Sequence, residues 1–155
     1  MKKNFMKAAA LTGTYVIMAL ISSCSKDPVV RQRSYTLTAN GASGVSGSVN
    51  ITEQTNKNFS IAVGLDKSIK DTLHLVKVYS GRINQAGPEI LDLGTVKGTG
   101  GNISIQKYSL DSIIVDGQKK AMTYDSIINY NAYVQVLFSA SRPDSILSRG
   151  NIGKQ

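Results

Sequence analysis

The sequence predicts an all-β protein, an antiparallel and Greek-key-like β-sandwich of about eight or nine short strands that follows a cleaved signal. Apolar residues beyond residue 32 alternate with polar ones at a period of two, as they do in half-buried strands. Glycine-rich breakers separate these runs, and none of them sustains a helical period. Many short strands at close spacing are typical of a sandwich or a barrel.

The first 23 residues predict a removable signal. Three lysines in the first seven residues precede an apolar run at 8–21, which spans only about 21 Å as a helix, whereas a bilayer core needs ~20 apolar residues. The run ends in Ile21-Ser22-Ser23-Cys24 and resembles a bacterial lipoprotein signal, which implies that Cys24 is lipidated and becomes the first residue of the mature chain. The alternative is an ordinary secretory signal that leaves Cys24, the only cysteine, as a spare thiol.

Lipidation would anchor the protein to a membrane of the cell envelope. One acyl chain holds only marginally, so the several chains, such as palmitate, that the resemblance implies are needed for a stable anchor. Residues 24–32 form the lipidated cysteine and a polar tether with Pro28, and residues 33–155 form one domain. We expect the outer membrane, and the sequence leaves the leaflet open.

Composition supports one domain and argues against a nucleic-acid partner. Removal of residues 1–23 leaves 132 residues and lowers the formal net charge from +8 to +5. A nucleic-acid binder concentrates its basic residues on one stripe, but the densest pairs here are Arg31 with Arg33 and Lys119 with Lys120. With a single cysteine, no disulfide stabilises the domain, so stability must come from apolar burial.

The strands follow one another with recognisable breakers between them. They are expected around Tyr35–Ala39, Val49–Ile51, Phe59–Leu65, Leu73–Tyr79, Ile90–Leu93, Ile103–Ile105, Ile113–Val115 and Tyr133–Phe138. Breakers are expected at Gly41–Gly47, Thr55–Asn58, Gly87-Pro88, Gly98–Asn102 and Asp116-Gly117. The glycine stretches 41–47 and 94–101 are expected to be hairpin loops. The runs at 59–65, 76–79 and 132–138 predict central strands, the mixed parity of 73–79 predicts a bulge or burial on both faces, and 111–129 predicts a hairpin or an excursion from the core.

The order of features between residues 35 and 153 resembles the CHRD domain, named for chordin and found in bacterial exported proteins. The matching motifs are Phe59–Leu65, Lys77-Val78-Tyr79-Ser80-Gly81, Gly87-Pro88-Glu89-Ile90-Leu91-Asp92-Leu93, Tyr133-Val134-Gln135-Val136 and Arg149-Gly150-Asn151-Ile152. The resemblance implies a β-sandwich.

This chain lacks the histidines that many bacterial members of that family carry. Lys77 and Tyr79 stand at the family's His-x-His pair, and Leu137 stands at a third histidine position. The only histidine, His74, is expected to be a structural residue, since zinc and copper sites need three or four nitrogen or sulfur ligands. We therefore expect no metal and no other cofactor. Lys77 and Tyr79 share one strand face and are candidates for a partner contact, or else for a rim lysine and a packed tyrosine.

Catalytic motifs are missing from the sequence. No Gly-x-Ser-x-Gly elbow accompanies the histidine, and the glycine stretches match neither a phosphate loop nor a dinucleotide fingerprint. A carboxylate pair for glycoside hydrolysis is conceivable among Glu53, Glu89, Asp92 and Asp111, although their spacing places no two of them together. We expect a protein that is not an enzyme.

Four triplets share the form aspartate, hydroxyl residue, aliphatic residue: Asp71-Thr72-Leu73, Asp111-Ser112-Ile113, Asp125-Ser126-Ile127 and Asp144-Ser145-Ile146. They resemble the acceptor motif of a general O-glycosylation system that acts on exported proteins in one group of Gram-negative bacteria. The resemblance implies glycans on Thr72, Ser112, Ser126 and Ser145, facing solvent. Equally, aspartate and serine favour turns before an aliphatic strand residue, and both interpretations stay open.

The sequence therefore favours a lipid-anchored, non-enzymatic envelope protein that binds an envelope protein, a glycan or the wall through its loops. Two alternatives remain. One is a metal-dependent enzyme of superoxide dismutase type, which needs more ligands than this chain supplies. The other is a structural subunit that assembles through its edge strands.

Overall fold

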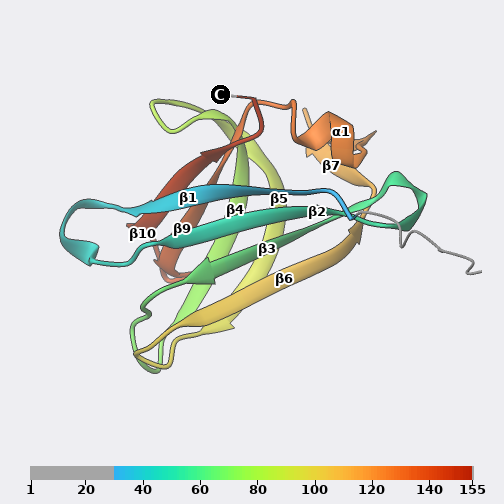
Figure 1. The fold of residues 1–155 in the computed structure, drawn as a ribbon. Helices are drawn as coiled ribbons and strands as arrows, with labels where there is room; N and C mark the ends of the chain where they lie inside the picture. The colour runs from blue at the N-terminus through green and yellow to red at the C-terminus, as the bar shows by residue number, and fades with distance from the viewer. Residues whose placement is uncertain (1–29, 155) are drawn as a thin grey trace, which may run out of the picture.

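The computed structural model describes residues 30–154, which form ten strands, one short α-helix and two 3₁₀ turns (Figure 1). The elements are β1 (Gln32–Ala39), β2 (Gly47–Glu53), β3 (Phe59–Leu65), β4 (Leu73–Arg82), β5 (Gln85–Lys97), β6 (Ile103–Leu110), β7 (Ser112–Val115), β8 (Gln118–Ala121), α1 (Tyr124–Ile127), β9 (Ala132–Ser139) and β10 (Arg142–Ile152). The 3₁₀ turns are Gly41–Ser43 and Thr55–Lys57. The signal, Cys24 and most of the tether lie outside these residues.

Eight strands make one antiparallel sheet in the order β5-β4-β9-β10-β1-β2-β3-β6, which curls until it is nearly closed into a barrel. In Figure 1, β1, β2, β3 and β6 run across the front, and β4, β5, β9 and β10 run behind them. The two halves therefore face each other as in a sandwich and are joined where β1 pairs with β10. The prediction of an antiparallel all-β fold is confirmed.

The core lies between the two halves and follows the period of two in the sequence. The inward residues of β1, β2 and β3 include Leu37, Val49 and Ile61, each fully buried, and Val76 and Val134 meet them from β4 and β9. Burying one such aliphatic side chain contributes about 1.5–3 kcal/mol, so the alternation fixes which face of each strand points inward.

The three strands predicted to be central are central. β3 lies between β2 and β6, while β4 and β9 are neighbours with further strands on both sides. A central strand that the pattern did not reveal is β10, which lies between β9 and β1. Its register with β9 shifts twice between Arg142 and Ser148, and this irregular pairing breaks the alternation expected of a strand.

Two predictions are wrong, a breaker at Gly87-Pro88 and a hairpin loop that begins at Gly94, because both positions lie inside β5. β5 is an edge strand, where a proline nitrogen need not donate to a neighbouring strand. Gly94, with φ of +99°, stands where the register with β4 shifts, so glycine supplies a bulge rather than a loop. The bulge expected in the 73–79 run exists, and the extra residues belong to β5.

Residues 111–129 contain the expected hairpin and an unexpected helix. β7 and β8 pair through a two-residue turn, Asp116-Gly117, in which both residues have positive φ, as a type I′ turn requires. α1 follows at once, with the Thr123 side chain accepting a hydrogen bond from the Ser126 amide as its N-cap. One turn of helix is too short to produce a helical period in the sequence.

Candidate functional site

The sheet stops one strand pairing short of closure, and this seam carries the main candidate site. In the described part of the chain, β5 pairs only with β4 and β6 pairs only with β3. The seam is bridged at one point, where Lys107 Nζ of β6 donates a hydrogen bond of 2.7 Å to the backbone oxygen of Asp92 of β5. The edges of β5 and β6 therefore face each other without the backbone hydrogen bonds of paired strands.

Local irregularity keeps the seam open. The register between β4 and β5 shifts at three points, and that between β6 and β3 shifts beside Phe59. Ser109 on β6 has φ of +52°, and its amide donates 2.8 Å to the side-chain oxygen of Gln54. Bulges bend an edge strand and end its pairing, so β5 and β6 diverge here.

A groove of about 440 Å³ occupies this divergence and is called the seam groove below. Its lining residues come from β5, β6 and the β7–β8 hairpin: Glu89, Ile90, Leu91, Asp92, Lys107, Ser109, Leu110, Asp111, Ser112, Ile113, Ile114 and Lys119. Ile90, Leu110 and Ile113 are buried, whereas Ile114 is 44% exposed. An apolar lining with charged groups beside it is the usual character of a binding site.

The charges around the seam groove are paired. Lys77 Nζ lies 2.7 Å from Glu89 Oε2, and this hydrogen bond raises the pKa of Lys77. The Ser112 hydroxyl donates to Asp111, and together with Lys119 it holds the pKa of Asp111 below its ordinary value. Positive and negative side chains are thus both present at neutral pH. A charged partner can form ion pairs with them in place of the ion pairs that they make with each other.

The groove collects three of the four carboxylates considered for glycoside hydrolysis, namely Glu89, Asp92 and Asp111. A general acid in that reaction needs a raised pKa, but Asp111 has a lowered one and Glu89 is held by Lys77. The residues that line the groove include neither histidine nor cysteine. The arrangement supports binding better than acid–base catalysis.

His74 is used by the fold itself. It is fully buried, and its Nε2 accepts a hydrogen bond of 3.1 Å from the Ile69 amide, while Nδ1 lies 3.0 Å from the Phe138 carbonyl oxygen, to which it donates. Both ring nitrogens therefore have backbone partners, which matches the structural role expected for His74. Among residues 30–154, no three histidine, cysteine or acidic side chains are grouped as metal ligands.

Lys77 and Tyr79 share the outer face of β4, as their spacing predicts, because His74, Val76 and Val78 point inward. The Tyr79 ring stacks on Tyr133 of β9 at a centroid distance of 5.3 Å, and burial raises the pKa of Tyr79. Of this pair, only Lys77 reaches the seam groove, through Glu89.

The four hydroxyl residues of the aspartate triplets lie in different local structures, and all retain some exposure. Thr72 precedes β4, Ser112 begins β7, Ser126 is exposed on α1, and Ser145 is in β10. Thr72 and Ser112 match the turn interpretation, since Thr72 Oγ1 donates to the Lys70 carbonyl and Ser112 bonds its own aspartate. Ser126 and Ser145 do not lie before a strand.

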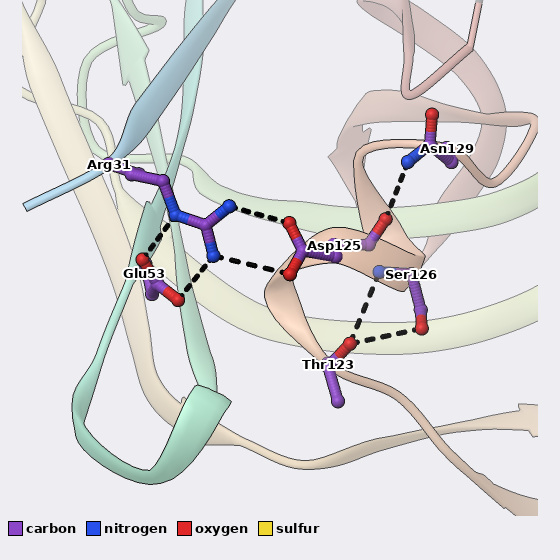
Figure 2. Close-up of polar contacts among 6 residues, drawn as sticks. All are labelled: Arg31, Glu53, Thr123, Asp125, Ser126 and Asn129. Carbon is purple, nitrogen blue, oxygen red and sulfur yellow. Dashed lines mark hydrogen bonds and ion pairs between the residues drawn. The ribbon is translucent and has the colours of Figure 1, made fainter.

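A cluster of ions fixes the start of the domain (Figure 2). Arg31 binds Glu53 at 2.6 Å through both Nε and Nη2, and it binds Asp125 at 2.7 Å through Nη1. Its guanidinium also lies 4.9 Å from the centre of the Tyr124 ring. These contacts lower the pKa of both carboxylates and tie the chain before β1 to α1 and to the end of β2. Sequence reasoning missed this cluster because its members lie far apart in the chain.

Comparisons with known proteins add no assignment: no protein family, no curated protein and no solved structure matches this chain. The described residues also contain no helix with the length and apolar character needed to cross a bilayer.

Proposed function

We propose that the chain is a lipid-anchored, non-enzymatic protein of the bacterial cell envelope that binds another envelope protein in the seam groove. The observation that carries the binding role is the groove itself, an apolar hollow with paired charges between two strand edges. The anchor at Cys24, the outer-membrane location and the CHRD relationship rest on the sequence alone.

The occupant that fits best is an extended segment of the partner. β5 and β6 each have a free edge along the groove, and an added strand gains affinity from main-chain hydrogen bonds to such an edge. Alternate side chains of that strand would enter the apolar lining of Ile90, Leu110 and Ile113, while the others would meet Lys107 and Glu89. Main-chain pairing supplies affinity, and the lining supplies specificity.

Site-specific photocrosslinking in intact cells tests this proposal. A photoreactive amino acid at position 114 lies beside the groove, and one at Leu73, which is 56% exposed and outside the groove, is the matched control. We expect one protein adduct from position 114 and none of the same mass from position 73. Equal adducts from both positions, or a saccharide adduct alone at position 114, would reject a protein partner in the groove.

The same seam speaks against assembly through edge strands as the main role. β5 and β6 face each other and are partly bridged by Lys107, so neither edge lies open to a second copy along its whole length. A groove between two facing edges admits one extended segment, but it does not offer the open edge that a folded second copy needs for sheet-to-sheet pairing.

We further propose O-glycans on Thr72, Ser126 and Ser145, and on Ser112 in chains whose seam groove holds no partner, because Ser112 lines that groove. The support is their shared triplet and the exposure that all four retain, since a glycan must reach solvent. Intact mass of the chain from its native host tests this: a mass equal to polypeptide plus lipid removes the proposal. Each site is then checked by an alanine variant, which should remove one glycan mass.

A further inference from the structure

A second hollow lies at the end of the sheet where the domain begins. It has a volume of about 440 Å³ and is lined by Arg33, Ser34 and Tyr35 of β1, by Asn129 after α1, and by Gly153 and Lys154 after β10. We call it the basic hollow. In Figure 1, the C-terminal end and α1 lie on the same side of the molecule.

The basic hollow exists because β1 leaves β10. The two strands pair only at Thr38 with Arg149 and at Ala39 with Ser148, whereas β1 stays paired with β2 from Gln32 to Leu37. Toward its start, β1 therefore has a sheet partner on one side only, and the backbone edge on the other side borders the hollow.

The charge of the hollow is positive. Arg33 and Lys154 are exposed, and neither takes part in an ion pair within residues 30–154. Arg82 lies next to Lys154, because its Nη2 donates to the Lys154 carbonyl oxygen at 3.4 Å. None of the lining residues is acidic.

The nearby carboxylates are already engaged in ion pairs. Arg31 holds Glu53 through two hydrogen bonds and Asp125 through two more. Arg31 carries one positive charge against the two negative charges of these carboxylates, which leaves −1. Arg33 and Lys154, with Arg82 beside Lys154, exceed that charge, so the hollow keeps a positive balance for an external anion. Guanidinium and ammonium groups that converge beside free backbone edges suit a phosphate group.

The hollow lies at the end of the domain nearest to Cys24, and this position favours a lipid headgroup as the source of the phosphate. Cys24 lies six residues before Val30, and six residues span at most about 20 Å in any conformation. Arg31 fixes the chain at this end through its contacts with Glu53 and Asp125. Acylation at Cys24 would therefore hold this end, rather than the opposite one, near the lipid headgroups.

We propose that the basic hollow binds the phosphate of an anionic lipid headgroup and thereby sets the orientation of the anchored domain. This inference rests on the proposed anchor.

Hydrogen exchange on the full chain, extracted with its anchor into uncharged maltoside micelles, tests the inference. One arm adds phosphatidylglycerol, a second adds an uncharged glycolipid, and a third adds inorganic phosphate alone. We expect phosphatidylglycerol to slow amide exchange at residues 33–35 and 153–154, the glycolipid to leave it unchanged, and inorganic phosphate to act only at millimolar concentration.

A charge-matched pair of variants separates the hollow from general electrostatics. A cation near an anionic lipid surface contributes about fivefold to binding, so the double variant R33Q/K154Q should need roughly 25-fold more phosphatidylglycerol for half-maximal protection. The control K67Q/K70Q removes the same charge from the β3–β4 connection, at the opposite end of the strands, and should change that value less than twofold.

Two results would overturn the inference. One is equal weakening by the control and the hollow variants. The other is inorganic phosphate that binds as tightly as the lipid, which would make the hollow a site for small anions. The phosphate arm needs no anchor, so a chain found without acyl groups would defeat the proposed anchor and leave the phosphate result to be judged separately.

Discussion

Replacement of His74 by alanine is expected to lower the free energy of unfolding by about 4 kcal/mol. The ring is fully buried and joins the Ile69 amide to the Phe138 carbonyl across two separate parts of the fold. Each backbone group left without a partner costs about 1–3 kcal/mol, and loss of a large buried side chain adds a cavity cost that brings such changes to about 3–5 kcal/mol.

Urea unfolding of residues 24–155 with Cys24→Ser, followed by circular dichroism, measures this loss. With a slope of about 2 kcal/mol per molar urea, the midpoint should fall by about 2 M. His74→Leu restores most of the buried volume but neither hydrogen bond, so it should recover about half of the loss.

Unfolding in the presence of the chelator EDTA is the control that separates the two hydrogen bonds of His74 from metal binding. If His74 acts through the two backbone hydrogen bonds, the loss is the same with and without excess EDTA. A shift below about 1 kcal/mol would contradict the structural role. A loss that disappears when EDTA is present would show that the histidine stabilises the chain through a metal.

Three further predictions concern single positions. Tyr35→Phe should leave the free energy of unfolding unchanged or raise it by up to about 1 kcal/mol, because the buried Tyr35 hydroxyl has no partner within the described residues; a clear loss would contradict this. Gly153→Ala should cost about 3 kcal/mol or more, since φ is +80° and the new methyl would meet a backbone carbonyl oxygen, whereas Gly117→Ala, with φ of +75° in open space, should cost only about 1 kcal/mol. Arg31→Gln should flatten the acid dependence of the melting temperature: Glu53 has a lowered pKa in the folded state, so its contribution is present above its ordinary value of 4.5 and is lost as the pH falls through the lowered value. An unchanged acid limb in the Arg31 variant would show that the ion cluster does not contribute to stability.

The regular part of the fold was predictable because burial on one face of a strand leaves a period of two in the sequence. The predicted strand Phe59–Leu65 has the same bounds as β3. The Asp116-Gly117 turn was predictable because aspartate followed by glycine is typical of turns in which both residues have positive φ. β10 was not predictable in this way, because its register shifts move residues out of phase with the alternation. The proline of β5 suggested a break, and only the edge position of that strand in the sheet explains why it is tolerated.

The candidate sites were less predictable than the strands. Lys77 was identified from its place on a strand face, but its partner Glu89 follows from the pairing of β4 with β5. The seam groove depends on which strands become edges, and the alternation of apolar residues does not encode strand order. Arg31 and Asp125 are 94 residues apart, a separation at which local sequence rules have no reach.

Mass spectrometry of the N-terminal peptide from membrane-extracted protein tests the anchored account most directly. The account predicts that the chain begins at Cys24 and that this residue carries a diacylglyceryl thioether and an amide-linked acyl chain. A chain that begins at any other residue, or at Cys24 with a free thiol, would contradict it.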